Sequence, residues 1–176
     1  MAWDSTNNYN ATLALALGYA PEVTTSTTSK PTTAQAEVMG RNSSALIRNL
    51  LRKCGFGPLT VTADTDADIT LRDVEAYLTS WSVLQAKHGV LNGDLADDAT
   101  DLRAKAIGDG DVESDAFKGS ILGCLCSMSA GDLEDAGVTA GGPDRTKALF
   151  AHWSDSASRS SSFTTGTATA PTDWQK

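Results

Sequence analysis

The chain has 176 residues, a length that suits one domain and is enough to bury a core. Its net charge is −8, its isoelectric point is near 4.6, and its basic residues are scattered among acids instead of clustered. Tight nucleic-acid binding needs clustered cations that neutralise phosphates, so this balance argues against direct DNA or RNA binding.

Residues 1–30 are predicted to form an extended arm. Its last part, from Thr24 onward, consists mostly of Thr and Ser, whose side chains compete for backbone hydrogen bonds and disfavour helix. The apolar run within Thr12–Gly18 is the one piece of the arm expected to be ordered.

The first helix is predicted to begin after Pro31 and to end near Cys54. Thr32 and Gln35 have the spacing of a capping box. Six apolar side chains then recur at three- and four-residue spacing, as on the buried face of a helix: Met39, Leu46, Ile47, Leu50, Leu51 and Cys54. The sequence Gly55-Phe56-Gly57-Pro58 stops the helix, because glycine permits a left-handed turn and proline bars continuation.

Three further helices are predicted after a short extended piece at Leu59–Thr62. The second helix runs from Thr70 to Gly89, and its apolar face comprises Val74, Tyr77, Leu78, Trp81, Leu84 and His88. A short third helix covers 102–107. A fourth helix covers 114–128, with a buried stripe of Phe117, Ile121, Leu125 and Met128.

Residues 138–176 are predicted to form a C-terminal segment and a tail arm. Eleven of the last 23 residues are Ser or Thr, and a chain of that length reaches on the order of 75 Å when extended. Such an arm orders only on binding. Buried aromatic side chains dominate docking energy, so the predicted protein-binding residues are Phe150, Trp153, Phe163 and Trp174.

The three cysteines, Cys54, Cys124 and Cys126, are expected to be free and mostly buried thiols. The sequence lacks the basic start of a signal peptide, and its longest apolar run, Leu13–Leu17, is far shorter than a membrane span. We therefore expect folding in a reducing cytoplasm, where disulfides are rare. A zinc site is not expected, because Cys124 and Cys126 would point to different sides of a helix.

The acidic segment Asp64–Glu75 raises the alternative of a calcium-binding helical interaction module. Acids stand at the first, third, fifth and twelfth positions of an EF-hand loop pattern. The sixth position requires a sharp turn that glycine makes, and here it holds Ile69, a β-branched residue that strongly disfavours positive φ. The preferred interpretation is an acidic turn at the positive N-terminus of the second helix.

No motif for catalysis is found. The two histidines, His88 and His152, have no nucleophile elbow, phosphate loop or His-Glu-x-x-His motif to work with. We predict that the protein is not an enzyme and uses no cofactor or metal.

Short patterns between residues 30 and 137 carry a resemblance to a known family. They are the lead Lys30-Pro31-Thr32 with the apolar run Val38–Leu51, the helix end Gly55-Phe56-Gly57-Pro58, the set Leu78, Trp81 and Leu84, and the turn Ala130-Gly131-Asp132-Leu133. In this order they resemble the head–tail connector (adaptor) proteins of tailed bacteriophages.

The sequence as a whole predicts an all-α fold: a small bundle of about four helices over 31–137, with extended arms at 1–30 and 138–176. The resemblance implies a virion structural protein of the neck, synthesised in the host cytoplasm and assembled as a ring of twelve copies. Its partners would be the portal protein and a tail or neck-stopper protein, with no membrane involved. DNA would pass through the ring without specific binding. Another phage neck or tail-completion protein is the alternative within this structural class.

Overall fold

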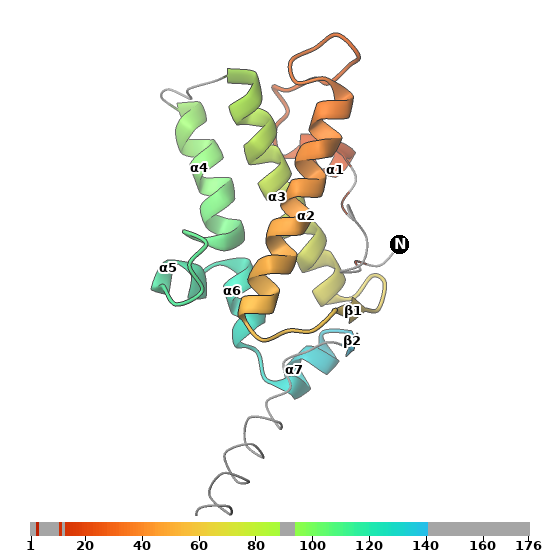
Figure 1. Ribbon diagram of the computed structural model, residues 1–176, viewed down its shortest axis with the longest axis vertical. Coiled ribbons are helices and arrows are strands. Elements are labelled where there is room, and N and C mark those ends of the chain that lie inside the picture. Colours follow the sequence, from red (N-terminus) through yellow and green to blue (C-terminus); the bar gives the residue numbers. More distant parts are fainter. Residues whose placement is uncertain (1–2, 4–10, 12, 89–93, 141–176) are drawn as a thin grey trace, which may run out of the picture. The chain divides into compact units, whose positions relative to one another are not determined.

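The computed structural model describes residues 3, 11, 13–88 and 94–140 (Figure 1). The chain divides into two units, 1–143 and 144–176, and every described residue belongs to the first. Seven helices and one two-stranded sheet make up the described part of the chain. The predicted all-α fold is confirmed, although the helices are more numerous than the predicted four.

The helix α2, Thr33–Lys53, begins at the predicted capping box. The Gln35 amide donates to Thr32 Oγ1 at 3.3 Å, and the Thr32 amide donates to Gln35 Oε1 at 2.9 Å. These two bonds satisfy backbone donors that the first turn of a helix leaves unpaired. Gly55, with a φ of +89°, follows the end of the helix as predicted.

The apolar stripe predicted on α2 is buried only in part. Ile47, Leu50 and Leu51 belong to the main core, but Leu46 is 37% exposed, so its assignment to the buried face is wrong. The next residue along the helix, Ile47, points about 100° away from Leu46 and is fully buried.

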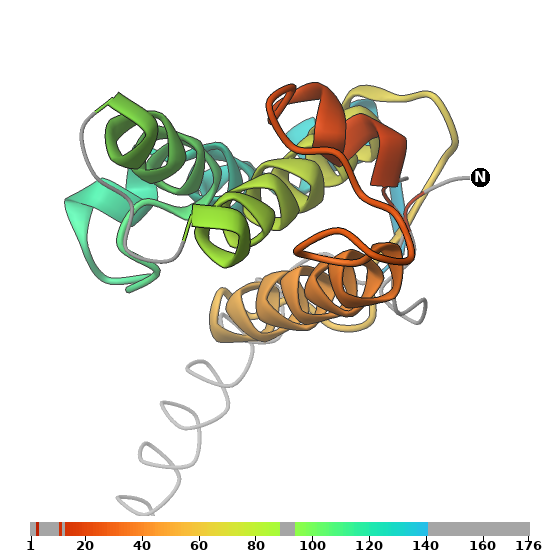
Figure 2. The ribbon, with the colours of Figure 1, turned by 90° about the horizontal axis from the view of Figure 1, so that it is seen from above.

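The helix α3, Asp66–His88, is the central helix of the described body. It packs against α1, α2, α4 and α6, and Figure 2 shows it between α4 on one side and α1 and α2 on the other. It begins before the predicted Thr70, because the Asp64 amide donates to Asp68 Oδ2 at 2.9 Å and an acid in the first turn stabilises a helix N-terminus. His88 is exposed at its last turn, which corrects its predicted place on the apolar face.

The described residues of the amino-terminal segment pack onto α3, which differs from the predicted extended arm. The short ordered piece is present as α1, Leu13–Gly18. Ala16 is fully buried, and the Ser80 hydroxyl of α3 donates to its carbonyl at 2.5 Å. Trp3 is also fully buried and belongs to the main core. Small residues permit this close approach, because Ala16 meets Ala76 of α3 in one cluster.

Tyr19 should titrate at unusually high pH. Burial, reinforced by Tyr77 and by the charge of Asp73, raises the pKa of the Tyr19 phenol from 10.0 to about 12. Its hydroxyl donates to Asp73 Oδ1 at 3.3 Å. Because the folded state disfavours the phenolate, this stabilisation is complete below pH 10 and is lost as the pH rises toward about 12. Tyrosinate absorbance will show the high-pH phase, and Tyr19→Phe will remove it; a normal titration of all tyrosines would contradict the prediction.

The helix predicted over 114–128 is interrupted. The structure has α5, Asp115–Lys118, and α6, Ile121–Ser127, which are separated by Gly119 and Ser120. Ser120 caps α6 by accepting from the Gly123 amide at 3.2 Å, and a new cap starts a new helix. The preceding helix α4, Asp94–Ile107, also begins earlier than the predicted 102–107.

Ala130-Gly131-Asp132-Leu133, predicted as a turn, forms the start of the helix α7, Ala130–Asp135. Ser129 and Asp132 make a reciprocal capping box, so these residues begin a helix and do not end one. The predicted extended piece at 59–62 contains β1, Thr60–Val61. It pairs antiparallel with β2, Val138–Ala140, which follows α7 and was not predicted.

Cys54 and Cys126 form a disulfide, with their Cα atoms 5.8 Å apart. This overturns the prediction of three free thiols. The bond joins the end of α2 to the last turns of α6, segments that sequence spacing alone does not bring together. Cys124 is free and exposed, so it is not the buried apolar side chain that was predicted. Cys124 and Cys126 do point to different sides of α6, as predicted.

Candidate protein-docking site

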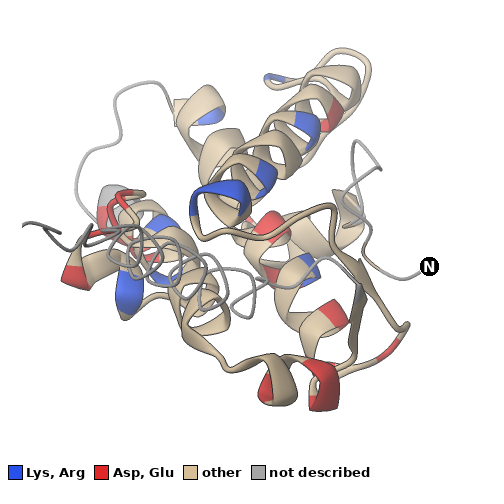
Figure 3. Cartoon of the chain, turned by 60° about the horizontal axis from the view of Figure 1, so that its bottom comes forward, with Lys and Arg blue, Asp and Glu red and all other residues tan. Residues whose placement is uncertain are grey.

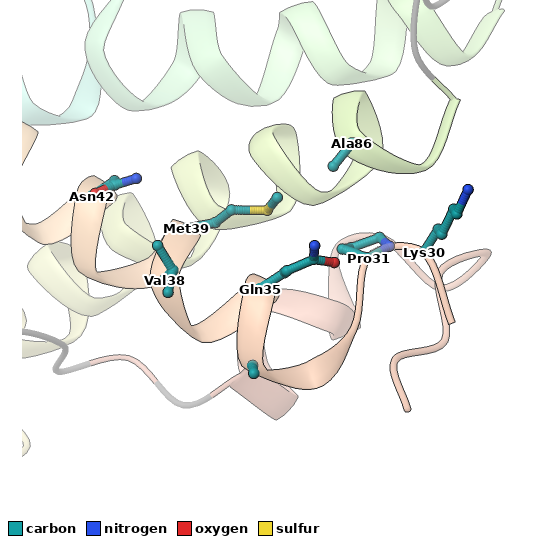
Figure 4. A pocket seen from close by; sticks show the side chains of 8 residues that line it. Lys30, Pro31, Gln35, Val38, Met39, Asn42 and Ala86 are labelled. Carbon is teal, nitrogen blue, oxygen red and sulfur yellow. The ribbon is translucent and has the colours of Figure 1, made fainter. Parts of the chain in front are cut away.

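An open apolar groove lies where the start of α2 meets the end of α3 (Figure 4). Its volume is about 570 Å³, and it is lined by Lys30, Pro31, Ala34, Gln35, Val38, Met39, Asn42 and Ala86. The capping box fixes the direction in which Pro31 enters α2. Five of the eight lining residues are apolar and three are polar, a mixture typical of a surface that receives another side chain.

The exposed apolar surface continues along α2 beyond the groove. Val38, which lines the groove, is 48% exposed, and Leu46, about two turns further along α2, is 37% exposed. Single exposed apolar side chains are ordinary, but Val38 is part of the groove itself. We call Val38, Leu46 and the groove together the α2 face.

Charge is unevenly distributed over the described elements (Figure 3). The helix α2 carries one acid, Glu37, and four basic residues: Arg41, Arg48, Arg52 and Lys53. The short helix α7 carries three acids, Asp132, Glu134 and Asp135, and no basic residue. Although the net charge of the chain is −8, α2 is basic and α7 is acidic.

A buried polar network holds Trp3 between α2 and α3. The Trp3 amide donates to Asp68 Oδ1 at 2.6 Å, and its indole Nε1–H donates to Glu75 Oε2 at 3.2 Å. Both acids are fully buried on α3. Ser44 of α2 donates to Glu75 Oε1, and Arg72 Nη2 lies 2.6 Å from Asp68 Oδ2. Buried carboxylates are tolerated only when they are bonded in this way.

The acidic segment Asp64–Glu75 does not form an ion-binding loop. Most of it is the first turns of α3, and Asp68 and Glu75 are engaged by protein donors. Ile69, at the position that needs positive φ, is helical and 48% exposed. Within the described residues, no group of three or more His, Cys, Asp or Glu side chains is placed to hold a metal ion.

The loop 109–113, which also carries acidic residues, is organised by its own hydrogen bonds. Asp109 Oδ1 accepts from the Ser114 hydroxyl at 2.6 Å and from the Asp111 amide at 3.0 Å. These bonds, with that from Ser114 the stronger, lower the pKa of Asp109 below its ordinary value. The Asp109 carboxylate thus holds the loop in place before α5, whose N-cap residue is Ser114.

The predicted protein-binding residues Phe150, Trp153, Phe163 and Trp174 lie outside the described residues, as does His152. His88 is exposed at the end of α3. No described helix is both long enough and apolar enough to cross a membrane.

Neither the α2 face nor the Trp3 network was predicted from the sequence. Val38 was available as an apolar residue one turn after Ala34, but its exposure depends on which side of α2 meets α3. Trp3 stands in a polar stretch with no periodic neighbours, so no local pattern marks it as a core residue. The one available signal was its size, because a lone tryptophan in a polar segment often serves as an anchor.

The described residues define a small all-α protein with an open apolar groove beside a basic helix. Comparison with known proteins finds no matching family model, no similar curated protein and no similar solved structure.

Proposed function

We propose that this chain is a structural subunit of a phage head–tail connector, which forms a ring beneath the portal and receives a tail or stopper protein. The resemblance over residues 30–137 motivates the family. The observation that carries the proposal is the α2 face, an open apolar surface. Exposed apolar patches on a protein surface commonly mark sites of contact with another protein. The proposed role is assembly and includes no catalytic step.

Ring formation needs two different, complementary patches on each copy. The basic helix α2 and the acidic helix α7 are such patches. Contact between unlike patches is heterologous, and it generates a ring when the rotation between copies closes. Complementary charge also fixes the register of two docking surfaces and disfavours wrong partners.

This assembly would also suit a channel for DNA. If α2 is covered by the acidic helix α7 of the next copy, its four basic residues are neutralised inside the interface. The remaining surface is then strongly acidic, because the whole chain carries −8. An acidic wall repels phosphates, so DNA would slide past it without being trapped.

Electron microscopy of the purified chain, alone and with its portal, tests the proposal. We expect rings near twelvefold symmetry that bind one end of the portal. A chain that stays monomeric and has no affinity for a portal would overturn the proposal. Binding to a tail component without binding to a portal would instead identify another neck or tail-completion protein.

Val38→Asp should block assembly without unfolding the subunit. Val38 is half exposed, so the substitution costs the isolated chain little, and the melting temperature should change by less than about 3 °C. A buried, unpaired carboxylate at the interface should weaken assembly at least tenfold, about 1.4 kcal/mol or more.

Ile69→Asp is the matched control for this experiment. Ile69 is equally exposed but lies on α3, outside the groove. Sedimentation velocity should show rings for this variant and monomers for Val38→Asp. Equal loss of assembly in both variants would show that the α2 face has no special role.

A further inference from the structure

Trp3 is bound by residues that are far from it in the sequence. Its two hydrogen bonds reach Asp68 and Glu75, which are 65 and 72 positions away in the chain. Its side chain is fully buried in the main core. One residue thus presents two N–H donors and a large apolar ring to a single buried site, which we call the Trp3 socket: Ser44, Asp68, Arg72 and Glu75.

The body orients the acceptors of the socket by itself. On Asp68, Oδ2 is fixed by the Asp64 amide and by Arg72, while Oδ1 faces the Trp3 amide. On Glu75, Oε1 is fixed by the Ser44 hydroxyl, while Oε2 accepts from the indole. Both carboxylates are therefore held in place by residues 44–75, and little reorganisation is needed when the tryptophan arrives.

We propose that the Trp3 socket is a binding site for the amino-terminal segment of a second copy of this chain, as well as for its own. The same segment makes the same contacts in either copy, so exchange costs little energy. Seven residues separate Trp3 from Ala11 and can span roughly 25 Å when extended. Segments exchanged in this way would tie neighbouring subunits together. The inference rests on the proposed assembly of copies.

Peptide binding tests the socket itself. The full-length Trp3→Ala chain leaves the socket empty, and a labelled synthetic peptide of residues 1–12 is the probe. We expect saturable one-to-one binding by fluorescence anisotropy and a rise in melting temperature. Should the variant be unfolded alone, the peptide should restore its helical circular dichroism.

Two variants separate recognition from nonspecific adhesion. A peptide carrying Trp3→Phe keeps an aromatic ring but lacks the indole donor, so it should bind at least tenfold more weakly. The protein variant Trp3→Ala with Ser44→Ala loses the hydrogen bond that orients Glu75, and its affinity should also fall. Equal binding of all peptides, or no binding and no restored helix, would overturn the socket as a binding site.

A mixing experiment tests the role of the second copy. Tagged Trp3→Ala chain is incubated with untagged full-length chain and recovered by its tag. Recovery of wild-type chain that the free peptide displaces supports exchange. Peptide binding without displaceable recovery would limit the socket to its own segment and refute the inference. If the wild-type chain forms rings but the peptide does not bind, this inference is wrong and the proposed ring stands. If the peptide binds but no rings form, the proposed ring is wrong.

Discussion

Loss of the Cys54–Cys126 disulfide should lower the free energy of unfolding by about 4 kcal/mol. The bond closes a loop between residues 72 positions apart, and cross-linking restricts the unfolded chain more as the loop grows. It joins the end of α2 to α6, and four elements lie between these two helices in the sequence: β1, α3, α4 and α5. Without it, the segment after α4 would be held to α2 by packing alone.

Urea unfolding of the oxidised chain and of Cys54→Ala with Cys126→Ala measures this loss. Cys124→Ser is the matched control, because Cys124 is exposed and unpaired, and its stability should stay within about 0.5 kcal/mol of the native value. A thiol count on the native chain should find one free thiol. Three free thiols, or equal stability of the double variant, would show that the bond is not formed.

The disulfide also bears on where the chain works. Disulfides persist in oxidising surroundings and at virion surfaces, and they are rare in a reducing cytoplasm. The bond contradicts the prediction of free thiols, and it counts against the reducing surroundings in which the chain was expected to fold.

The long helices were predictable because their signals are local. Thr32 and Gln35 set the start of α2, and a repeating apolar face marks both α2 and α3. The break between α5 and α6 escaped prediction because Ser120 can either continue a helix or cap a new one. In the structure Ser120 caps α6, and Gly123 allows α6 to pack closely against the α5 backbone.

Features that depend on distant parts of the chain could not be predicted. The partner of β1 lies in β2, beyond five intervening helices, and a two- or three-residue strand has too little pattern to be recognised. Trp3 and its acceptors on α3 are a similar case. For the same reason the acids of Asp64–Glu75 resembled ion ligands, whereas two of them bind the amino-terminal segment instead.

Gly123→Ala should destabilise the body by about 3 kcal/mol or more, through overpacking against a rigid neighbour. A Cβ at this position would lie 1.8 Å from the Phe117 carbonyl oxygen and 2.9 Å from Lys118 Cα. Both are backbone atoms, so no side-chain rotation can relieve the contact. Either α6 moves away from α5 or the Ser120 cap is lost, and both changes disturb Leu122 and Leu125 in the main core.

Gly131→Ala separates this steric effect from the general effect of adding a methyl group to a helical glycine. Gly131 lies in α7, where a Cβ would meet only Ser129 Oγ at 3.9 Å. Because alanine restricts the unfolded chain more than glycine, this control should be neutral or gain up to about 1 kcal/mol. Thermal and urea unfolding of both variants give the comparison. Equal stability of the two variants would mean that α6 does not approach α5 closely at Gly123.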